Sequence, residues 1–166
     1  MSGLLFETPL INRKNNIKIN PKLSLILNGS QPSSDKVSNE ESTNNSYSLL
    51  HSNNLNRYTG ADKLDNSKRI NYGIDISKDL LKFSLSQSYE FDANSSYNKD
   101  LGLNDYMSDL LGSLNFDDLN NELQHNFRFN VDQGLIKSQS LNYKNTNIIG
   151  TSEFKYSQER KENNSI

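Results

Sequence analysis

Apolar and polar side chains alternate along most of the chain, which is the period expected of β-strands. Between Ile17 and Leu27 the odd positions are almost all apolar and most even positions are polar. The same alternation recurs in six further runs, over residues 69–77, 81–91, 110–116, 119–129, 135–143 and 148–156. A short opening strand with Leu4, Phe6 and Leu10 precedes them. Because no helical spacing competes, the sequence predicts an all-β protein of about eight antiparallel strands.

The connections between these runs are of two kinds. Short polar turns at 12–16, 77–79, 117–118 and 144–147 alternate with connections at 28–66, 92–106 and 132–134, of which the first two are long. Consecutive antiparallel strands place alternate connections at opposite ends of the sheet, so one end has tight turns and the other has loops. Strands of about ten residues with this asymmetry are typical of an up-and-down transmembrane β-barrel with short periplasmic turns and long external loops.

In a membrane barrel, the apolar and the polar set of side chains face opposite sides of the wall. The apolar set, including Leu81, Phe83, Leu85, Leu123 and Phe127, is expected to face hydrocarbon, and the polar set to line a wet interior. Aromatic residues near strand ends predict two interfacial girdles. The girdle at the loop end contains Tyr89, Phe91, Phe127, Phe129, Phe154 and Tyr156, and the girdle at the turn end contains Phe116 and Tyr143.

Three polar residues fall on the predicted lipid face. Lys137 lies near a strand end, from which its ammonium can extend to the interface. His125 and Gln87 lie closer to mid-depth, where the sequence offers them no partner. Two other folds share the alternation and stay open at this point. One is a soluble β-sandwich whose apolar face packs on a second sheet, and the other is a small porin-like barrel that closes on itself.

Composition excludes several functional classes. Only 33% of the residues are apolar and Asn and Ser make up nearly a third of the chain, but eight Tyr, seven Phe and the regular alternation argue against disorder. The net charge of -2 does not favour nucleic acid as a partner. The chain contains no cysteine, and its start lacks the features of a signal peptide. His51 and His125 have no Ser-His-acid spacing, so we expect no enzyme, no catalytic residue, no cofactor and no metal site.

A set of motifs in the first half resembles a known family. Pro9-Leu10 is followed by an extended strand with Pro21, then by Asn39-Glu40-Glu41-Ser42 in the long loop 28–66. The run NRYTGADK then leads into the strand that contains Arg69. In this order the motifs resemble the barrel domain of the lipopolysaccharide-assembly outer-membrane proteins (LptD/OstA family). Lys63 stands where the family usually has arginine, and Glu41 where it has aspartate, so a bidentate contact is lost at Lys63.

The resemblance implies a function in the cell outer membrane. Members of this family form a large barrel that inserts lipopolysaccharide into the outer leaflet, with a plug lipoprotein and periplasmic bridge proteins as partners. The resemblance makes residues 1–166 a single, partial barrel domain, a fragment from the middle of the barrel in which Met1 is an internal methionine. The mechanism that the resemblance implies is non-enzymatic: a polar wall of Lys, Ser, Asn and Glu side chains meets the sugar–phosphate head, and the apolar exterior faces lipid.

The family motif maps onto a loop that re-enters the barrel. Gly60 permits a backbone conformation closed to other residues, Arg57 can pair with Asp62 across the turn, and Tyr58 can lie at headgroup level. These residues either order the external loop or contact lipopolysaccharide directly, and the sequence leaves both roles open. The motif consists of Asn56, Arg57, Tyr58, Gly60, Asp62, Lys63 and Arg69.

Overall fold

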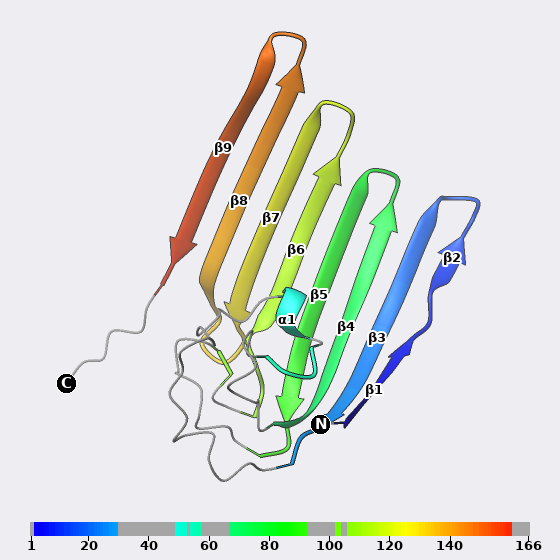
Figure 1. The fold of residues 1–166 in the computed structure, drawn as a ribbon, viewed down its shortest axis with the longest axis vertical. Helices are drawn as coiled ribbons and strands as arrows, with labels where there is room; N and C mark the ends of the chain where they lie inside the picture. The colour runs from blue at the N-terminus through cyan, green and yellow to red at the C-terminus, as the bar shows by residue number, and fades with distance from the viewer. Residues whose placement is uncertain are drawn as a thin grey trace, which may run out of the picture.

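The strands form one antiparallel sheet in the computed structural model, which describes residues 2–29, 49–52, 54–57, 67–92, 102–103 and 106–160 (Figure 1). Strand order follows the sequence, β1-β3-β4-β5-β6-β7-β8-β9, and β2 also pairs with β3. The elements are β1 (Ser2–Glu7), β2 (Leu10–Asn12), β3 (Ile17–Leu27), α1 (Leu49–Ser52), β4 (Lys68–Lys78), β5 (Leu81–Glu90), β6 (Leu110–Asp117), β7 (Asn121–Asn130), β8 (Leu135–Asn147) and β9 (Gly150–Glu159). The predicted all-β, up-and-down antiparallel architecture is confirmed.

The sheet has nine strands where about eight were predicted, because the opening strand is interrupted. The register of β1 and β2 against β3 is continuous, with Glu7 opposite Lys22 and Leu10 opposite Ile19. At the break, the Thr8 amide donates to the Pro21 carbonyl at 3.4 Å, but Pro21 has no N–H with which to return the bond. Pairing therefore lapses at Thr8 and Pro9 and resumes at Leu10.

The sheet is open. In the part of the chain that the structure describes, β1 and β2 pair only with β3, and β9 pairs only with β8. The two edges therefore do not meet, and closure into a barrel is not observed. A second sheet is not observed either, because all the described strands belong to this one layer (Figure 1). No helix among the described residues is long and apolar enough to cross a membrane.

The two ends of the sheet differ as predicted. At the turn end, short connections join β2 to β3, β4 to β5, β6 to β7 and β8 to β9, as the row of hairpins in Figure 1 shows. Asn16 and Asp79 adopt positive φ angles of 49° and 51° in the first two of these turns. In the third, the Asp118 Oδ1 accepts hydrogen bonds from the amides of Asn120 and Asn121 at 2.8 and 2.7 Å. The connections from β3 to β4 and from β5 to β6 lie at the opposite end, the loop end, together with the brief turn from β7 to β8.

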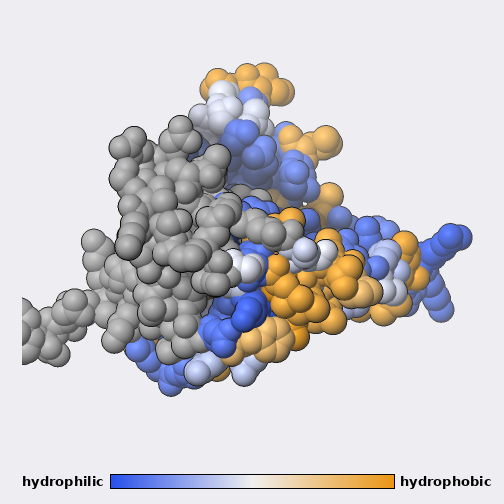
Figure 2. All heavy atoms as spheres, turned by 60° about the horizontal axis from the view of Figure 1, so that its bottom comes forward, coloured by the Kyte–Doolittle hydropathy of each residue, from blue (hydrophilic) through white to orange (hydrophobic). Residues whose placement is uncertain are grey.

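The two faces of the sheet have opposite character. Residues opposite each other on neighbouring strands share a face. One row of the apolar face runs through Ile19, Ile76, Phe83, Leu114, His125, Leu141 and Tyr156. The adjacent row of the polar face runs through Asn20, Asp75, Ser84, Ser113, Asn126, Ser140 and Ser157. Figure 2, viewed towards the loop end, shows the apolar residues gathered in an extended patch.

Burial is inverted relative to a water-soluble domain. Within the described ranges only three apolar side chains are buried, those of Ile26, Leu103 and Leu111, whereas seventeen polar or charged ones are. The large side chains of the apolar face are mostly part-exposed or fully exposed, among them Leu81 and Leu114. The five apolar residues expected to face outward do not converge on a dry nucleus, because no second layer covers them in the described structure.

The predicted positions of Lys137, Phe154 and Tyr156 are wrong, and all three residues lie in the last hairpin. The register between β7 and β8 shifts between Arg128 and Phe129, so that β8 holds an extra residue, Lys137. This bulge turns Lys137 away from the apolar face, and its side chain is 8% exposed. Phe154 lies opposite Tyr143, in the same row as Phe116, and Tyr156 lies in the row of His125, so neither residue lies near the loop end of the sheet.

Candidate functional site

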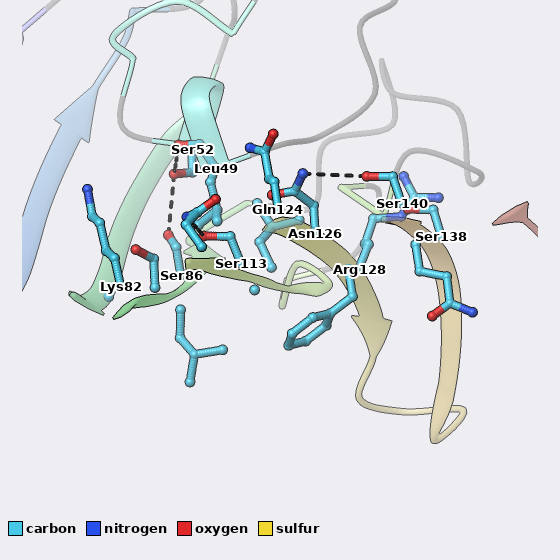
Figure 3. A pocket seen from close by; sticks show the side chains of 18 of the residues that line it. Leu49, Ser52, Lys82, Ser86, Ser113, Gln124, Asn126, Arg128, Ser138 and Ser140 are labelled. Carbon is cyan, nitrogen blue, oxygen red and sulfur yellow. Dashed lines mark hydrogen bonds between the residues drawn. The ribbon is translucent and has the colours of Figure 1, made fainter. Parts of the chain in front are cut away.

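A polar groove runs across the sheet from β3 to β9, on the face that carries the serine and asparagine rows. Its volume is about 650 Å³. Figure 3 shows α1 on one side of it, with Leu49 and Ser52 directed towards Ser86 and Ser113 of the sheet. The polar side chains that line it include Lys22, Ser52, Asp75, Lys82, Ser84, Ser86, Ser113, Asn115, Gln124, Asn126, Arg128, Ser138, Ser140 and Ser157.

The groove is hydrophilic and carries little net charge. Its amides and hydroxyls bond across the strands, for example from Asn126 Nδ2 to Ser140 Oγ at 3.4 Å (Figure 3). Its cations have acidic neighbours: Lys22 Nζ lies 2.9 Å from an Asp75 carboxylate oxygen and 3.6 Å from one of Glu7. The groove therefore offers many hydrogen-bonding groups and no concentrated charge, a lining suited to water and to hydroxylated molecules.

Two buried arginines, Arg57 and Arg69, lie at the loop end of β4 and β5. Arg57 Nη1 lies 2.5 Å from Glu90 Oε1, and Arg57 Nη2 donates to Ser88 Oγ at 2.8 Å. Arg69, directly opposite Glu90 in the sheet, donates to Ser67 Oγ and to the Asn54 carbonyl. Both arginines bind groups of this chain and are buried, so they fasten residues 54–57 to the ends of β4 and β5.

A second ion pair lies where β6, β7 and β8 reach the loop end. Arg128 Nε lies 3.4 Å from Asp109 Oδ2, and Asn130 Nδ2 donates to Asp109 Oδ1 at 2.7 Å. Burial raises the pKa of Asp109, and the hydrogen bond from Asn130 and the charges of Arg128 and Lys137 only partly oppose this effect. The bulge at Lys137 thus brings a third charged group to the same buried cluster.

The structure brings together part of the predicted motif. Asn56, Arg57 and Arg69 lie in the described part of the chain. Arg57 contacts Glu90 at the end of β5, and Arg69 of β4 contacts the Asn54 carbonyl. Tyr58, Gly60, Asp62 and Lys63 lie outside the described residues, as does the predicted Arg57–Asp62 pair. Arg57 and Arg69 are both buried, and each is bonded to other residues of this chain. Whether the motif orders the loop or contacts lipopolysaccharide stays a prediction.

The sequence did not point to Glu90 as the acidic partner of Arg57. Glu90 is the last residue of the polar set in the predicted strand 81–91, and this phase was the available signal. Its partner comes from the long connection, 33 residues earlier in the chain, so no local spacing relates the two.

The chain matches no protein-family model and no curated protein. Its geometry and the motif resemblance are therefore the two grounds on which a function can be proposed.

Two polar residues, Gln87 and His125, lie on the apolar face, and Gln87 has hydrogen-bond partners there. The Tyr72 hydroxyl donates to Gln87 Oε1 at 2.7 Å, and Gln87 Nε2 donates to the Ser108 carbonyl at 2.9 Å. The His125 ring lies 6.0 Å from that of Phe127, between Leu114 and Leu141 in its row, and on the face away from the groove. Within the described ranges, no group of three His, Asp or Glu side chains could hold a metal ion.

Proposed function

We propose that this chain forms an arc of the wall of an outer-membrane β-barrel, and that this barrel inserts lipopolysaccharide into the outer leaflet. The apolar face would contact lipid and the polar face would line the path of the hydrophilic head. The partners would be those that the resemblance implies, a plug lipoprotein inside the barrel and the periplasmic proteins that deliver lipopolysaccharide. The process is transport and requires no catalytic group.

The observation that carries the membrane part of this proposal is the inverted burial of the two faces. In water, exposing a Leu or Phe side chain forfeits about 1.5–3 kcal/mol relative to burying it. The sheet exposes such side chains along whole rows and buries serine, asparagine and arginine instead. In hydrocarbon the same exposed rows become favourable, and strands of ten or eleven residues, as in β3, β4, β5, β7 and β9, match the length needed to cross a bilayer with tilt.

The segment over the polar face favours a wide barrel over a small one. The backbone of α1 lies on this face, with the Ser86 hydroxyl donating to Ser52 Oγ at 3.3 Å. An eight-stranded barrel has an interior just wide enough for side chains. A sheet that holds a helical turn against its inner face therefore fits as an arc of a larger barrel, which supports the large family barrel over the porin-like alternative.

Membrane contact can be tested on the chain itself, because it contains no cysteine. Leu123→Cys lies on the apolar face and Gln124→Cys, its neighbour in β7, lines the groove. Each would be labelled with an environment-sensitive fluorophore, and the protein reconstituted in vesicles with brominated acyl chains. We expect strong quenching at position 123 and weak quenching at 124. Equal quenching at both positions, or a protein that stays in buffer as a soluble species, would refute the membrane assignment and favour a soluble binding module.

Transport of lipopolysaccharide needs a separate test. A photoreactive side chain at Asn126, in the groove, should cross-link to lipopolysaccharide in reconstituted vesicles, whereas one at Phe116, on the apolar face near the turn end, should cross-link mainly to bulk phospholipid. Cross-linking of Asn126 to water-soluble sugars alone, with no lipopolysaccharide adduct, would favour a porin-like function. The quenching experiment is unaffected by that outcome, so the two parts of the proposal fail independently.

A further inference from the structure

We propose that the bilayer is thinned beside β9, where phospholipid headgroups contact Ser152 and Gln158 on either side of a short apolar belt. The inference rests on the proposed contact between the apolar face and lipid, and it adds where along the sheet that contact is shortest. The surface concerned is the outer face of β9, and its partner is the headgroup and glycerol region of the bilayer.

The apolar belt narrows from the first long strand to the last. In β3 every position on the apolar face is apolar, and these positions are Ile17, Ile19, Pro21, Leu23, Leu25 and Leu27. In β9 the same face carries Phe154 and Tyr156, with Ser152 before them and Gln158 after them. Because β9 has ten residues, its short belt reflects the side chains it carries and not the length of the strand.

The neighbouring strand β8 is intermediate between these two cases. Leu141 and Tyr143 are apolar-face residues next to the belt of β9, and Gln139 separates them from Ile136 further along the strand. Gln139 lies in the row of Leu85 of β5, so one row of the same face is apolar in β5 and polar in β8 and β9.

Two tyrosines mark the edges of the short belt. The Tyr143 hydroxyl donates to Asn121 Oδ1 at 2.8 Å, towards the turn end, and the Tyr156 hydroxyl donates to Gln158 Oε1 at 3.1 Å, towards the loop end. A tyrosine at a membrane interface places its ring against hydrocarbon and its hydroxyl at the headgroup level. The rings of Tyr143 and Tyr156 lie in adjacent rows, yet their hydroxyls are directed to opposite interfaces.

The polar groups beyond the belt are amides that suit a headgroup environment. Gln139 Nε2 donates to Gln158 Oε1 at 2.9 Å, and Asn145 Nδ2 donates to Asn121 Oδ1 at 2.8 Å. Each amide has two N–H donors and an oxygen with two lone pairs, so these contacts leave capacity for water and for lipid phosphate or ester oxygens. In hydrocarbon that remaining capacity would be unsatisfied and costly.

Strand tilt does not account for the short belt. Tilt shifts the belt from one strand to the next, but both interfaces move together, so its height stays the same. Ser152 and Gln158 are six residues apart, which is about 20 Å along the strand and about 15 Å along the membrane normal at a tilt of about 40°. The hydrocarbon core is about 30 Å thick, so both residues lie outside it only where the bilayer is thinned, as it is around short apolar segments.

The test compares two pairs of positions with the same separation. Ser152→Cys and Gln158→Cys flank the belt of β9, and Ile19→Cys and Leu25→Cys lie six residues apart on the same face of β3. All four side chains are exposed or part-exposed, so the substitutions remove no buried core. Each single-cysteine protein would be labelled with an environment-sensitive fluorophore and reconstituted in vesicles of phospholipid that carries either brominated acyl chains or a nitroxide on the headgroup.

We expect brominated chains to quench positions 19 and 25 about threefold or more strongly than positions 152 and 158, and the headgroup nitroxide to give the reverse order. Strong quenching of either β9 position by brominated chains, with 19 and 25 also quenched, would overturn the inference and leave the membrane assignment standing. Weak quenching of 152 and 158 by both quenchers would also overturn it, because protein and not lipid would then cover this face. Weak quenching by brominated chains at all four positions and at position 123 would refute the membrane assignment and the inference together.

Discussion

Placing an arginine in the middle of the apolar face tests the assignment of the two faces most directly. Leu114 lies in β6 between Phe83 and His125, with apolar rows on both sides. Asn115, the next residue of the same strand, points to the opposite face and lines the groove. Leu114→Arg and Asn115→Arg therefore add the same side chain at nearly the same depth, on opposite sides of one strand.

The expected cost follows from the exposure of the leucine. An arginine on the lipid face near the bilayer midplane costs about 2–4 kcal/mol. Leu114 is 36% exposed, and contact of about a third of its side chain with hydrocarbon is worth about 0.5–1 kcal/mol, which the substitution forfeits. Leu114→Arg should thus lower the free energy of unfolding by about 2.5–5 kcal/mol in a bilayer. Asn115→Arg faces a hydrated groove and should change it by less than about 1 kcal/mol.

The assay is urea-induced unfolding of the chain in phospholipid vesicles, followed by far-UV circular dichroism. The midpoint should fall sharply for Leu114→Arg and stay near the wild-type value for Asn115→Arg. Equal midpoints for the two variants, or a larger loss for Asn115→Arg, would show that the apolar face does not contact lipid. Either result would refute the proposed orientation of the sheet.

Four further predictions follow from local contacts. Gly112→Ala should destabilise the sheet by about 1–3 kcal/mol in the same unfolding assay, because a Cβ there would overlap the Phe127 ring, and Phe127→Leu should restore part of the loss. Tyr72→Phe should cost about 0.5–1.5 kcal/mol by removing the hydroxyl that donates to Gln87. Backbone hydrogen bonds hold the pKa of Asp118 below its ordinary value of 3.8. The stabilisation of the β6–β7 turn by this carboxylate should therefore be complete above pH 3.8 and disappear as the pH falls through the lowered pKa. Faster amide exchange of this turn at low pH should show the loss, and Asp118→Ala should abolish the pH dependence. The chain alone in buffer should aggregate through the edges of β1 and β9 in light scattering, and a monodisperse, cooperatively melting monomer would contradict this.

The strands could be predicted because a single period governs them. Ile17–Leu27 was predicted with the bounds that the structure shows, and the bounds of β4 and β5 differ from the prediction by one residue at each affected end. On such a strand, the polarity of each side chain indicates which face of the sheet it lies on. The difference between the turn end and the loop end of the sheet could be predicted from the lengths of the connections alone, without knowledge of the strand pairing.

Features that depend on pairing could not be predicted from the period. The bulge at Lys137 shifts the phase of one strand relative to its neighbour, and nothing in the local sequence marks it. Phe154 was placed at the wrong end because the predicted strand 148–156 begins and ends earlier than β9, which runs from Gly150 to Glu159. Phe154 therefore lies closer to the turn before β9 than predicted. Arg57 pairs with Glu90 across a long connection, and such long-range contacts leave no trace in local spacing. These are the points at which tertiary structure overrides the pattern.

The sequential strand order has a consequence for how such a sheet can grow. Each strand from β3 to β8 is hydrogen-bonded to its predecessor and successor in the chain, so the contact order of the sheet is low wherever the connections are short. A sheet of this kind can zip up one hairpin at a time from a single nucleus. Insertion or duplication of a hairpin would lengthen it by two strands while every existing strand keeps its direction and facing. The width of the sheet can therefore change by whole hairpins in evolution without a new topology.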